Sequence, residues 1–300
     1  MRKRILALLA ALGATTLYGL NHTVAKGIMP DLVSPFAFIF MRVIGGFVFF
    51  WLAAIFAPKE KIEREDFKRI FLAAVFGAFI NMLAFFSGLE LSSPINSALI
   101  VTTTPITTLL LSIVILKEQV TRLKASGIAL GFLGALLLIL VSQEIRVDAP
   151  NPTLGNSLIM LNSVSYSFYL ILIRSLMLKY NPFTILKWIF TFAILLNTPL
   201  TLNSFLEVEW SNIPLWGYGT IAFVVIGVTC LTFLLNAYAM TELKASTIGV
   251  FSYVQPVIAI LFAIIAGKDS FTPVKMGATI LVFTGVFMAT KKKSKPIEVS

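Results

Sequence analysis

Apolar stretches of about 20 residues, separated by short turns, recur along nearly the whole chain. The hydrocarbon core of a bilayer is about 30 Å thick and an α-helix rises about 1.5 Å per residue, so each stretch is long enough to cross it. A spanning backbone has no water to bond, which leaves helices or a closed barrel. Barrel strands alternate in hydrophobicity, and runs such as residues 133–141 do not. The sequence therefore predicts an all-α membrane protein.

The composition leaves no room for a separate soluble domain. Hydrophobic residues make up 58% of the chain and charged residues 13%, against about 45–50% and 25% in soluble proteins. The first 14 residues could also pass for a signal peptide, but the apolar run continues past Tyr18 and Asn21, which favours a first span.

Ten transmembrane helices are predicted, at residues 5–25, 34–56, 68–89, 94–116, 123–141, 154–178, 183–203, 215–238, 246–266 and 273–290.

Basic residues are distributed unevenly among the connections between these spans. Of the 24 Lys and Arg residues, 19 fall at the termini or in alternate connections, four in the other connections, and Arg42 inside the second span. Positive residues favour the cytoplasmic side. We therefore predict a multi-pass protein of the cytoplasmic (inner) membrane of a bacterium with both termini in the cytoplasm. The net charge of +10 is explained by this orientation rather than by a nucleic-acid partner.

The two halves of the chain show a weak internal repeat. Shifting the sequence by about half its length aligns Pro105 with Pro256, Tyr18 with Tyr166, and Lys117-Glu118 with Lys268-Asp269. We place the repeats at residues 1–145 and 146–300, with five spans each. An odd number of spans turns the second repeat upside down in the membrane, an arrangement found in secondary transporters with a midplane substrate site.

Polar residues inside the spans are the candidates for a substrate site, because they are costly in hydrocarbon and tend to face a cavity. Their helical spacing places several on common stripes, although helix packing explains small polar residues equally well. Pro105 and Pro256 are expected to break helices and to serve gating, with simple kinks as the alternative. The predicted substrate-binding residues are Tyr18, Asn21, His22, Asn81, Tyr166, Tyr169, Trp188, Asn236, Tyr253 and Gln255.

Three ionisable residues, His22, Arg42 and Glu118, lie within or directly beside the predicted spans. His22 is the only histidine, and its ordinary pKa of about 6.5 makes it a candidate for proton coupling, with a packed hydrogen-bonding residue as the alternative. Arg42 is expected to be a structural charge bonded to carboxylates or backbone carbonyls, with contact to an anionic substrate as the alternative. Glu118 is also expected to be structural.

Several classes of protein are disfavoured by what the sequence lacks. With one histidine and one cysteine, Cys230, it offers no metal cluster or Cys–His pair. No Gly-rich phosphate loop followed by lysine appears, and no filter or charged ring typical of a channel. We expect no enzyme activity, cofactor or metal, and a chain that functions as a monomer with the bilayer and a small-molecule substrate as its partners. A carrier without ion coupling, a non-transporting subunit and a membrane enzyme remain alternatives.

Short motifs follow one another in a recognisable order and spacing. The first half contains Tyr18-Gly19-Leu20-Asn21, Ser34-Pro35, Met41-Arg42, Gly88-Leu89-Glu90, Ser97-Ala98, Thr104-Pro105, Lys117-Glu118-Gln119-Val120-Thr121, Gly127 and Gly134. The second half contains Ala237-Tyr238-Ala239, Ala245, Gln255-Pro256-Val257, Gly277 and Gly285. By these motifs the chain resembles the drug/metabolite transporter superfamily in its EamA-like branch. Tyr18 stands where the family commonly has tryptophan, and Asp269 where it has glutamate.

The resemblance implies a ten-helix transporter built of inverted five-helix repeats. Members of this family move small metabolites such as amino acids, mostly as exporters. Their cavity is lined by the first, third, fourth, sixth, eighth and ninth spans, which are the spans that carry the polar stripes. The expected function is therefore secondary transport of amino acids or related compounds.

Overall fold

The computed structural model of the protein describes residues 2–29, 31–92, 94–141, 150–265 and 272–291. All regular elements in these residues are helical. In the first half they are α1 (Arg2–Lys26), α2 (Pro35–Ala54), α3 (Arg64–Ala74), the π-helix η1 (Val75–Phe79), α4 (Ile80–Leu91), α5 (Pro94–Val101), α6 (Thr104–Leu116) and α7 (Arg122–Val141). In the second half they are α8 (Pro152–Met177), α9 (Pro182–Leu206), the 3-10 helix η2 (Trp210–Asn212), α10 (Leu215–Ala222), the π-helix η3 (Phe223–Leu231), α11 (Thr232–Glu242), α12 (Ala245–Val250), the 3-10 helix η4 (Phe251–Tyr253), α13 (Val254–Ile265) and α14 (Pro273–Thr290).

These elements join into the predicted number of spans. Within the described residues, ten helices or continuous helical series are long and apolar enough to cross a membrane. The third span is α3–η1–α4, the fourth α5–α6, the eighth α10–η3–α11 and the ninth α12–η4–α13. The all-α fold with ten spans is confirmed, and the helix ends lie within a few residues of the predicted ones.

Side-chain caps followed by proline fix where several helices begin. Ser34 accepts a hydrogen bond from the Ala37 N–H at 3.2 Å, with Pro35 as the first residue of α2. A capping side chain satisfies a free N–H of the first turn, and proline is tolerated there because its missing N–H would have no partner. The same arrangement begins α8, α9 and α14, with Asn151, Asn181 and Thr272 as the caps.

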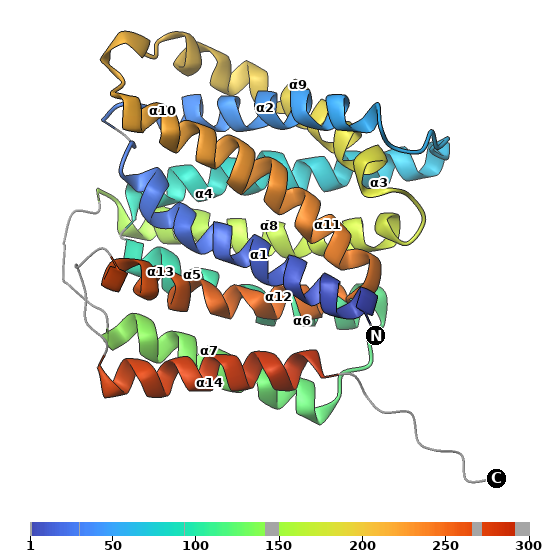
Figure 1. The fold of residues 1–300 in the computed structure, drawn as a ribbon, viewed down its shortest axis with the longest axis vertical. Coiled ribbons are helices and arrows are strands. Elements are labelled where there is room, and N and C mark those ends of the chain that lie inside the picture. The colour runs from blue at the N-terminus through green and yellow to red at the C-terminus, as the bar shows by residue number, and fades with distance from the viewer. Residues whose placement is uncertain (1, 30, 93, 142–149, 266–271, 292–300) are drawn as a thin grey trace.

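Both ends of the described chain lie at one end of the bundle. The Arg4 guanidinium of α1 donates from Nη2 to the carbonyl oxygen of Thr290, the last residue of α14, at 2.7 Å. Figure 1 shows the start of α1 and the end of α14 on the same side of the molecule. We call this the terminal end and the other the distal end. An even number of spans requires this placement.

The two halves are interrupted at matching places, which supports the repeat. The third and eighth spans each contain a π-helix, η1 and η3. The fourth and ninth spans are each interrupted, the fourth by a turn at residues 102–103 and the ninth by η4. Helix pairing also matches between the halves: α8 packs on α4 and α6, and its counterpart α1 packs on α11 and α13. The chain is thus two repeats of five spans, as the sequence predicts.

The bundle consists of two central groups of helices held between two pairs. The α4 group contains α3, η1, α4, α5, α6 and α8; the α1 group contains α1, α10, η3, α11, α12, η4 and α13. Helices α2 and α9 pack against each other on one side of these groups, and α7 and α14 on the other (Figure 1). Each of these pairs joins one helix from each half of the chain.

Glycines allow the α7 and α14 backbones to come into direct contact. A Cβ atom at Gly134 would lie 2.8 Å from the Val282 nitrogen and 2.9 Å from the Ala278 carbonyl oxygen. Small residues that permit such close approach are the usual means of packing helices in a membrane, where lipid is as apolar as the side chains.

We expect Gly134→Leu to destabilise the protein, because the added side chain would force two backbones apart. Overpacking of this kind costs about 1–3 kcal/mol. Thermal unfolding in detergent should therefore occur at a lower temperature than in the wild type. The control is Gly277→Leu in α14, because nothing lies within 4 Å of a Cβ there. Equal melting temperatures for the two variants would contradict this account of the pair.

Candidate functional site

A pocket lies between the α4 group and the α1 group. Its free space is about 80 Å³, room for several water molecules, so a metabolite requires the surrounding side chains to move apart. Most of its walls are aromatic, apolar or uncharged polar groups, a composition common in small-molecule sites. The lining residues are Tyr18, Asn21, Arg42, Asn81, Met82, Phe85, Val101, Thr104, Asn162, Tyr166, Phe233, Ser252 and Gln255.

Aromatic rings from both repeats form a chain along one wall. Tyr18 and Tyr166 meet edge to face with ring centroids 6.3 Å apart. Tyr166 stacks on Tyr169 at 5.9 Å, and Tyr169 contacts Phe233 at 5.6 Å. Such ring pairs are favourable beyond their buried area. The two tyrosines that the repeat aligns, Tyr18 and Tyr166, therefore contact each other in this wall of the pocket.

Amide groups fix the polar side of the pocket. The Asn162 side chain donates to the Asn81 carbonyl oxygen at 3.0 Å, and the Asn81 side chain donates back to the Asn162 carbonyl oxygen at 3.4 Å. This reciprocal pair joins α4 to α8. Asn236 of α11 donates from Nδ2 to the Tyr166 hydroxyl at 3.3 Å. Asn21 is 4% exposed, and its Oδ1 has no hydrogen-bond partner in the described part of the chain.

Arg42 is the charged residue of the pocket wall. It is 5% exposed, and its Nε donates to the Thr229 hydroxyl at 2.8 Å. The guanidinium carbon lies 5.2 Å from the centroid of the Phe86 ring, within the range of a cation–π contact. Among the described residues, a hydroxyl and a ring hold Arg42, whereas the sequence led us to expect carboxylates or backbone carbonyls.

Five of the predicted substrate-binding residues line the pocket: Tyr18, Asn21, Asn81, Tyr166 and Gln255. Tyr169 and Asn236 support Tyr166 from behind. Tyr253 is fully buried against Gly131 of α7. Trp188 lies elsewhere, beside Trp51 and Phe67 near the terminal end.

His22 belongs to α1, but its side chain lies outside the part of the structure that is described. Its predicted roles in substrate binding and proton coupling therefore stay predictions.

Pro105 and Pro256 follow the two helix interruptions. Pro105 is in the first turn of α6, directly after the turn at residues 102–103. Pro256 is the third residue of α13, just after η4. The adjacent residues Thr104 and Ser252 line the pocket from these two places. The interruptions therefore bring irregular backbone to the cavity, where it is tolerated in membrane proteins.

The two groups of helices meet at the terminal end. In the described residues, every extensive contact between them joins α6 or α8 to α11, α12 or η4. Arg174 of α8 donates to the Met240 carbonyl oxygen of α11 in this region. The groups make no comparable contact toward the distal end among the described residues. The pocket is therefore closed on the terminal side.

An ion-pair cluster around Glu118 closes the same side. The Glu118 carboxylate accepts from Lys124 Nζ at 2.7 Å and from the Ser246 hydroxyl at 2.6 Å, and Lys244 Nζ lies 3.6 Å away. Burial raises the pKa of the Glu118 carboxyl, but the hydrogen bonds from Lys124 and Ser246 outweigh that effect and the pKa is lowered. The cluster joins the α6–α7 connection to the beginning of α12, and so joins the two repeats.

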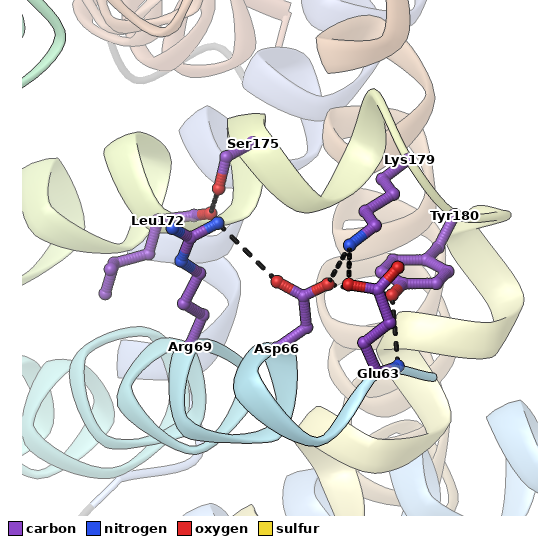
Figure 2. Close-up of polar contacts among 7 residues, drawn as sticks. All are labelled: Glu63, Asp66, Arg69, Leu172, Ser175, Lys179 and Tyr180. Atoms are coloured by element: carbon purple, nitrogen blue, oxygen red, sulfur yellow. Dashed lines mark hydrogen bonds and ion pairs between the residues drawn. The ribbon is translucent and has the colours of Figure 1, made fainter. Parts of the chain in front are cut away.

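A second cluster at the terminal end holds α3 to the α8–α9 connection (Figure 2). Lys179 donates to Asp66 at 2.7 Å and also to Glu63, and the Tyr180 hydroxyl donates to Asp66 at 2.7 Å. Arg69 lies 3.5 Å from the other Asp66 oxygen. The hydrogen bonds to Asp66 and Glu63 raise the pKa of Lys179, so this lysine keeps its charge across the physiological range.

Sequence reasoning did not select the other lining residues as binding candidates. Thr104, Asn162 and Ser252 lie on polar stripes and carried a usable signal. The apolar lining residues carried none, because a pocket-facing apolar side chain has the same sequence pattern as a lipid-facing one. These are Met82, Phe85, Val101 and Phe233.

Comparisons with known proteins agree with this architecture. The model of the EamA-like transporter family matches residues 5–140 and again residues 153–291. The uncharacterized transporter YyaM of Bacillus subtilis is 27% identical over 77% of this chain and 76% of its own length. An uncharacterized transporter of Archaeoglobus fulgidus is 26% identical over 93% of this chain and 96% of its own. A solved crystal structure with 19% sequence identity has the same fold, with a TM-score of 0.77 over 95% of this chain and 96% of that one.

Ten spans among the described residues, an internal repeat and a pocket lined by residues of both halves are the features of a membrane transport protein. The two matches to the family model cover both repeats and nearly the whole chain. The chain belongs to the EamA-like transporter family.

Proposed function

We propose that the chain is a secondary transporter that moves small metabolites, amino acids and related compounds among them, out of the cytoplasm by alternating access. The observation that carries this proposal is the central pocket, which lies between two groups of helices whose extensive contacts, among the described residues, are all toward the terminal end. Transport requires the groups to separate at the terminal end and to close at the distal end. The matched interruptions of the fourth and ninth spans, beside Pro105 and Pro256, are the expected hinges.

The orientation belongs to the same proposal. The excess of basic residues at the terminal end predicts that this end is cytoplasmic, in the cytoplasmic membrane of a bacterium. The pocket would then face outward in the present conformation. The chain carries a complete pocket within one copy, which supports function as a monomer.

Single cysteines test the orientation. In a Cys230→Ala background, Pro150→Cys should react with a membrane-impermeant maleimide applied to intact cells, because Pro150 is exposed at the distal end. Lys291→Cys should react only after the membrane is permeabilised, because Lys291 follows α14 at the terminal end. Labelling of Lys291→Cys in intact cells would contradict the assignment.

Counterflow in proteoliposomes tests transport itself. Vesicles with the purified protein, loaded with unlabelled L-leucine or L-phenylalanine, should transiently accumulate the same radiolabelled compound, whereas protein-free vesicles should not.

Repeating the counterflow assay with an imposed pH gradient, in the wild type and in His22→Gln, tests proton coupling. An unchanged pH profile in His22→Gln would leave exchange or facilitated diffusion as the mode. Absence of counterflow for both compounds would contradict the proposed function.

A further inference from the structure

Arg42 is a buried cation with no anionic partner among the residues that the structure describes. Its side chain is 5% exposed in the second span, where an uncompensated charge is expensive. Among the described residues no carboxylate lies within ion-pair distance of it, in contrast to Lys124 and Lys179, which both have such partners. Arg42 is also the one charged side chain among the described residues that line the pocket.

The local structure positions Arg42 without using its terminal nitrogens. Its Nε donates to the Thr229 hydroxyl, and that hydroxyl donates to the Val224 carbonyl oxygen at 3.0 Å. Val224 and Thr229 both belong to the π-helix η3, and such helices often occur at functional sites because they alter the backbone hydrogen bonding. The Phe86 ring lies against the guanidinium, 5.2 Å from its carbon. In the described part of the chain no hydrogen bond from Nη1 or Nη2 is found.

A guanidinium held in this way is suited to one kind of ligand group. Its planar edge offers parallel N–H donors that match the two oxygens of a carboxylate. A single cation balances a monoanion, whereas a phosphate dianion would need more positive charge than the described lining provides. An amine without an anionic group would be repelled in a pocket of low dielectric constant. The remaining walls, with Phe85 and Phe233 among them, suit an apolar body.

We propose that Arg42 is the anion-binding group of the pocket and that the transported compound carries a carboxylate on a small apolar body. The statement that the compound is transported rests on the proposed function. The carboxylate-binding site does not depend on that function. A zwitterion fits when its ammonium reaches an uncharged acceptor such as the Oδ1 of Asn21, which has no hydrogen-bond partner among the described residues. A simple amine does not fit.

Matched compounds test the charge preference of the wild-type protein. On an isobutyl skeleton they are 4-methylpentanoate, L-leucine and 3-methylbutylamine; on a benzyl skeleton they are 3-phenylpropionate, L-phenylalanine and 2-phenylethylamine. Binding to the purified protein in detergent is measured by titration calorimetry. At least one acid or amino acid should bind, and the amine of the same skeleton should bind at least about tenfold more weakly. Equal binding of acid and amine, or no binding by any acid or amino acid, would overturn the proposal.

Variants of Arg42 and Thr229 test whether Arg42 is the anion-binding group. Arg42→Gln should weaken binding of the acids by about 10- to 100-fold, the loss expected for charge-assisted hydrogen bonds. Arg42→Lys should retain the preference for acids over amines with lower affinity, because lysine keeps the charge but loses the planar edge. Thr229→Val should also weaken binding without changing that preference. The matched control is Thr201→Val, a buried threonine of α9 outside the pocket, which should bind as the wild type does.

The outcomes separate this inference from the proposed function. Acids that bind through Arg42 in detergent, with no counterflow in vesicles, would support the anion site and contradict transport. Counterflow that Arg42→Gln leaves unchanged would support transport and overturn the anion site. Because Arg42→Gln removes a buried charge that has no anionic partner in the described part of the chain, it is not expected to prevent folding.

Discussion

A disulfide between cysteines at positions 108 and 249 should reduce transport to the level of protein-free vesicles. Thr108 lies in α6 of the α4 group and Gly249 in α12 of the α1 group, where the two groups meet. A Cβ atom at position 249 would lie 3.1 Å from the Thr108 Cβ. Disulfides have Cβ atoms about 3.5–4.5 Å apart, so a small shift allows the bond to form. The oxidised protein would then be held closed at the terminal end.

Reduction should restore transport in the same sample, which separates the disulfide from any effect of the substitutions. The background carries Cys230→Ala so that no other thiol takes part. The matched control pair is Ser92→Cys with Gly155→Cys, whose Cβ atoms would lie 2.8 Å apart. That pair joins α4 to α8 within the α4 group, at the distal end. Transport that survives oxidation of the 108–249 pair would contradict a mechanism in which the two groups separate.

Glu118→Gln should be strongly destabilising. Glu118 and Lys124 have side-chain exposures of 5% and 10%, and removing one partner of a buried pair leaves the other charge uncompensated. Breaking such a pair costs about 3–5 kcal/mol, so the melting temperature in detergent should fall well below that of the wild type. The control is Glu65→Gln, because Glu65 is exposed near the start of α3.

Replacing the three buried members of the cluster should reverse the effect. A triple variant, Glu118→Leu with Lys124→Met and Ser246→Ala, exchanges the buried polar groups for apolar ones of similar size. Such exchanges are often neutral or stabilising, so the melting temperature should return to that of the wild type. If the triple variant were as unstable as Glu118→Gln, the uncompensated charge of Lys124 could not be the cause of the lower melting temperature.

The stability should also depend on pH in a defined direction. The pKa of Glu118 is lowered in the folded protein, so its contribution is complete above the ordinary glutamate value of about 4.3 and is lost as the pH falls through the lower folded value. Acidification below about pH 4.3 should therefore destabilise the wild type more than the triple variant. Lys179 has a raised pKa, so its contribution is present below the ordinary lysine value and would be lost only in strongly alkaline solution.

The spans and the central pair of tyrosines were predictable because both follow from the cost of placing polar groups in hydrocarbon. That cost limits where polar residues occur, and helical spacing then assigns Tyr18 and Asn21 to one face. The repeat extended the argument to Tyr166. All three line the pocket.

The apolar part of the pocket and the neighbours of Arg42 were not predictable. Phe233 lines the pocket, whereas Phe71 packs against Phe192 outside the pocket lining. Both are phenylalanines in apolar runs, so the sequence does not distinguish the two positions. Trp188 was predicted to bind substrate because of its ring, but it packs with Trp51 where aromatic residues gather near a membrane interface. Thr229, which accepts the hydrogen bond from Arg42, lies in the π-helix η3, and an apolar run gives no sign of such a helix.

A cysteine in the pocket would test alternating access without knowledge of the substrate. Ser252 lines the pocket from η4 and is close to cysteine in size. In the Cys230→Ala background, Ser252→Cys should react with an impermeant thiol reagent in both right-side-out and inside-out vesicles. When the 108–249 disulfide is also present, reaction should persist from the distal side and cease from the terminal side. Without the disulfide, reaction of Ser252→Cys from one side alone would contradict alternating access. With the disulfide, reaction from both sides would also contradict it.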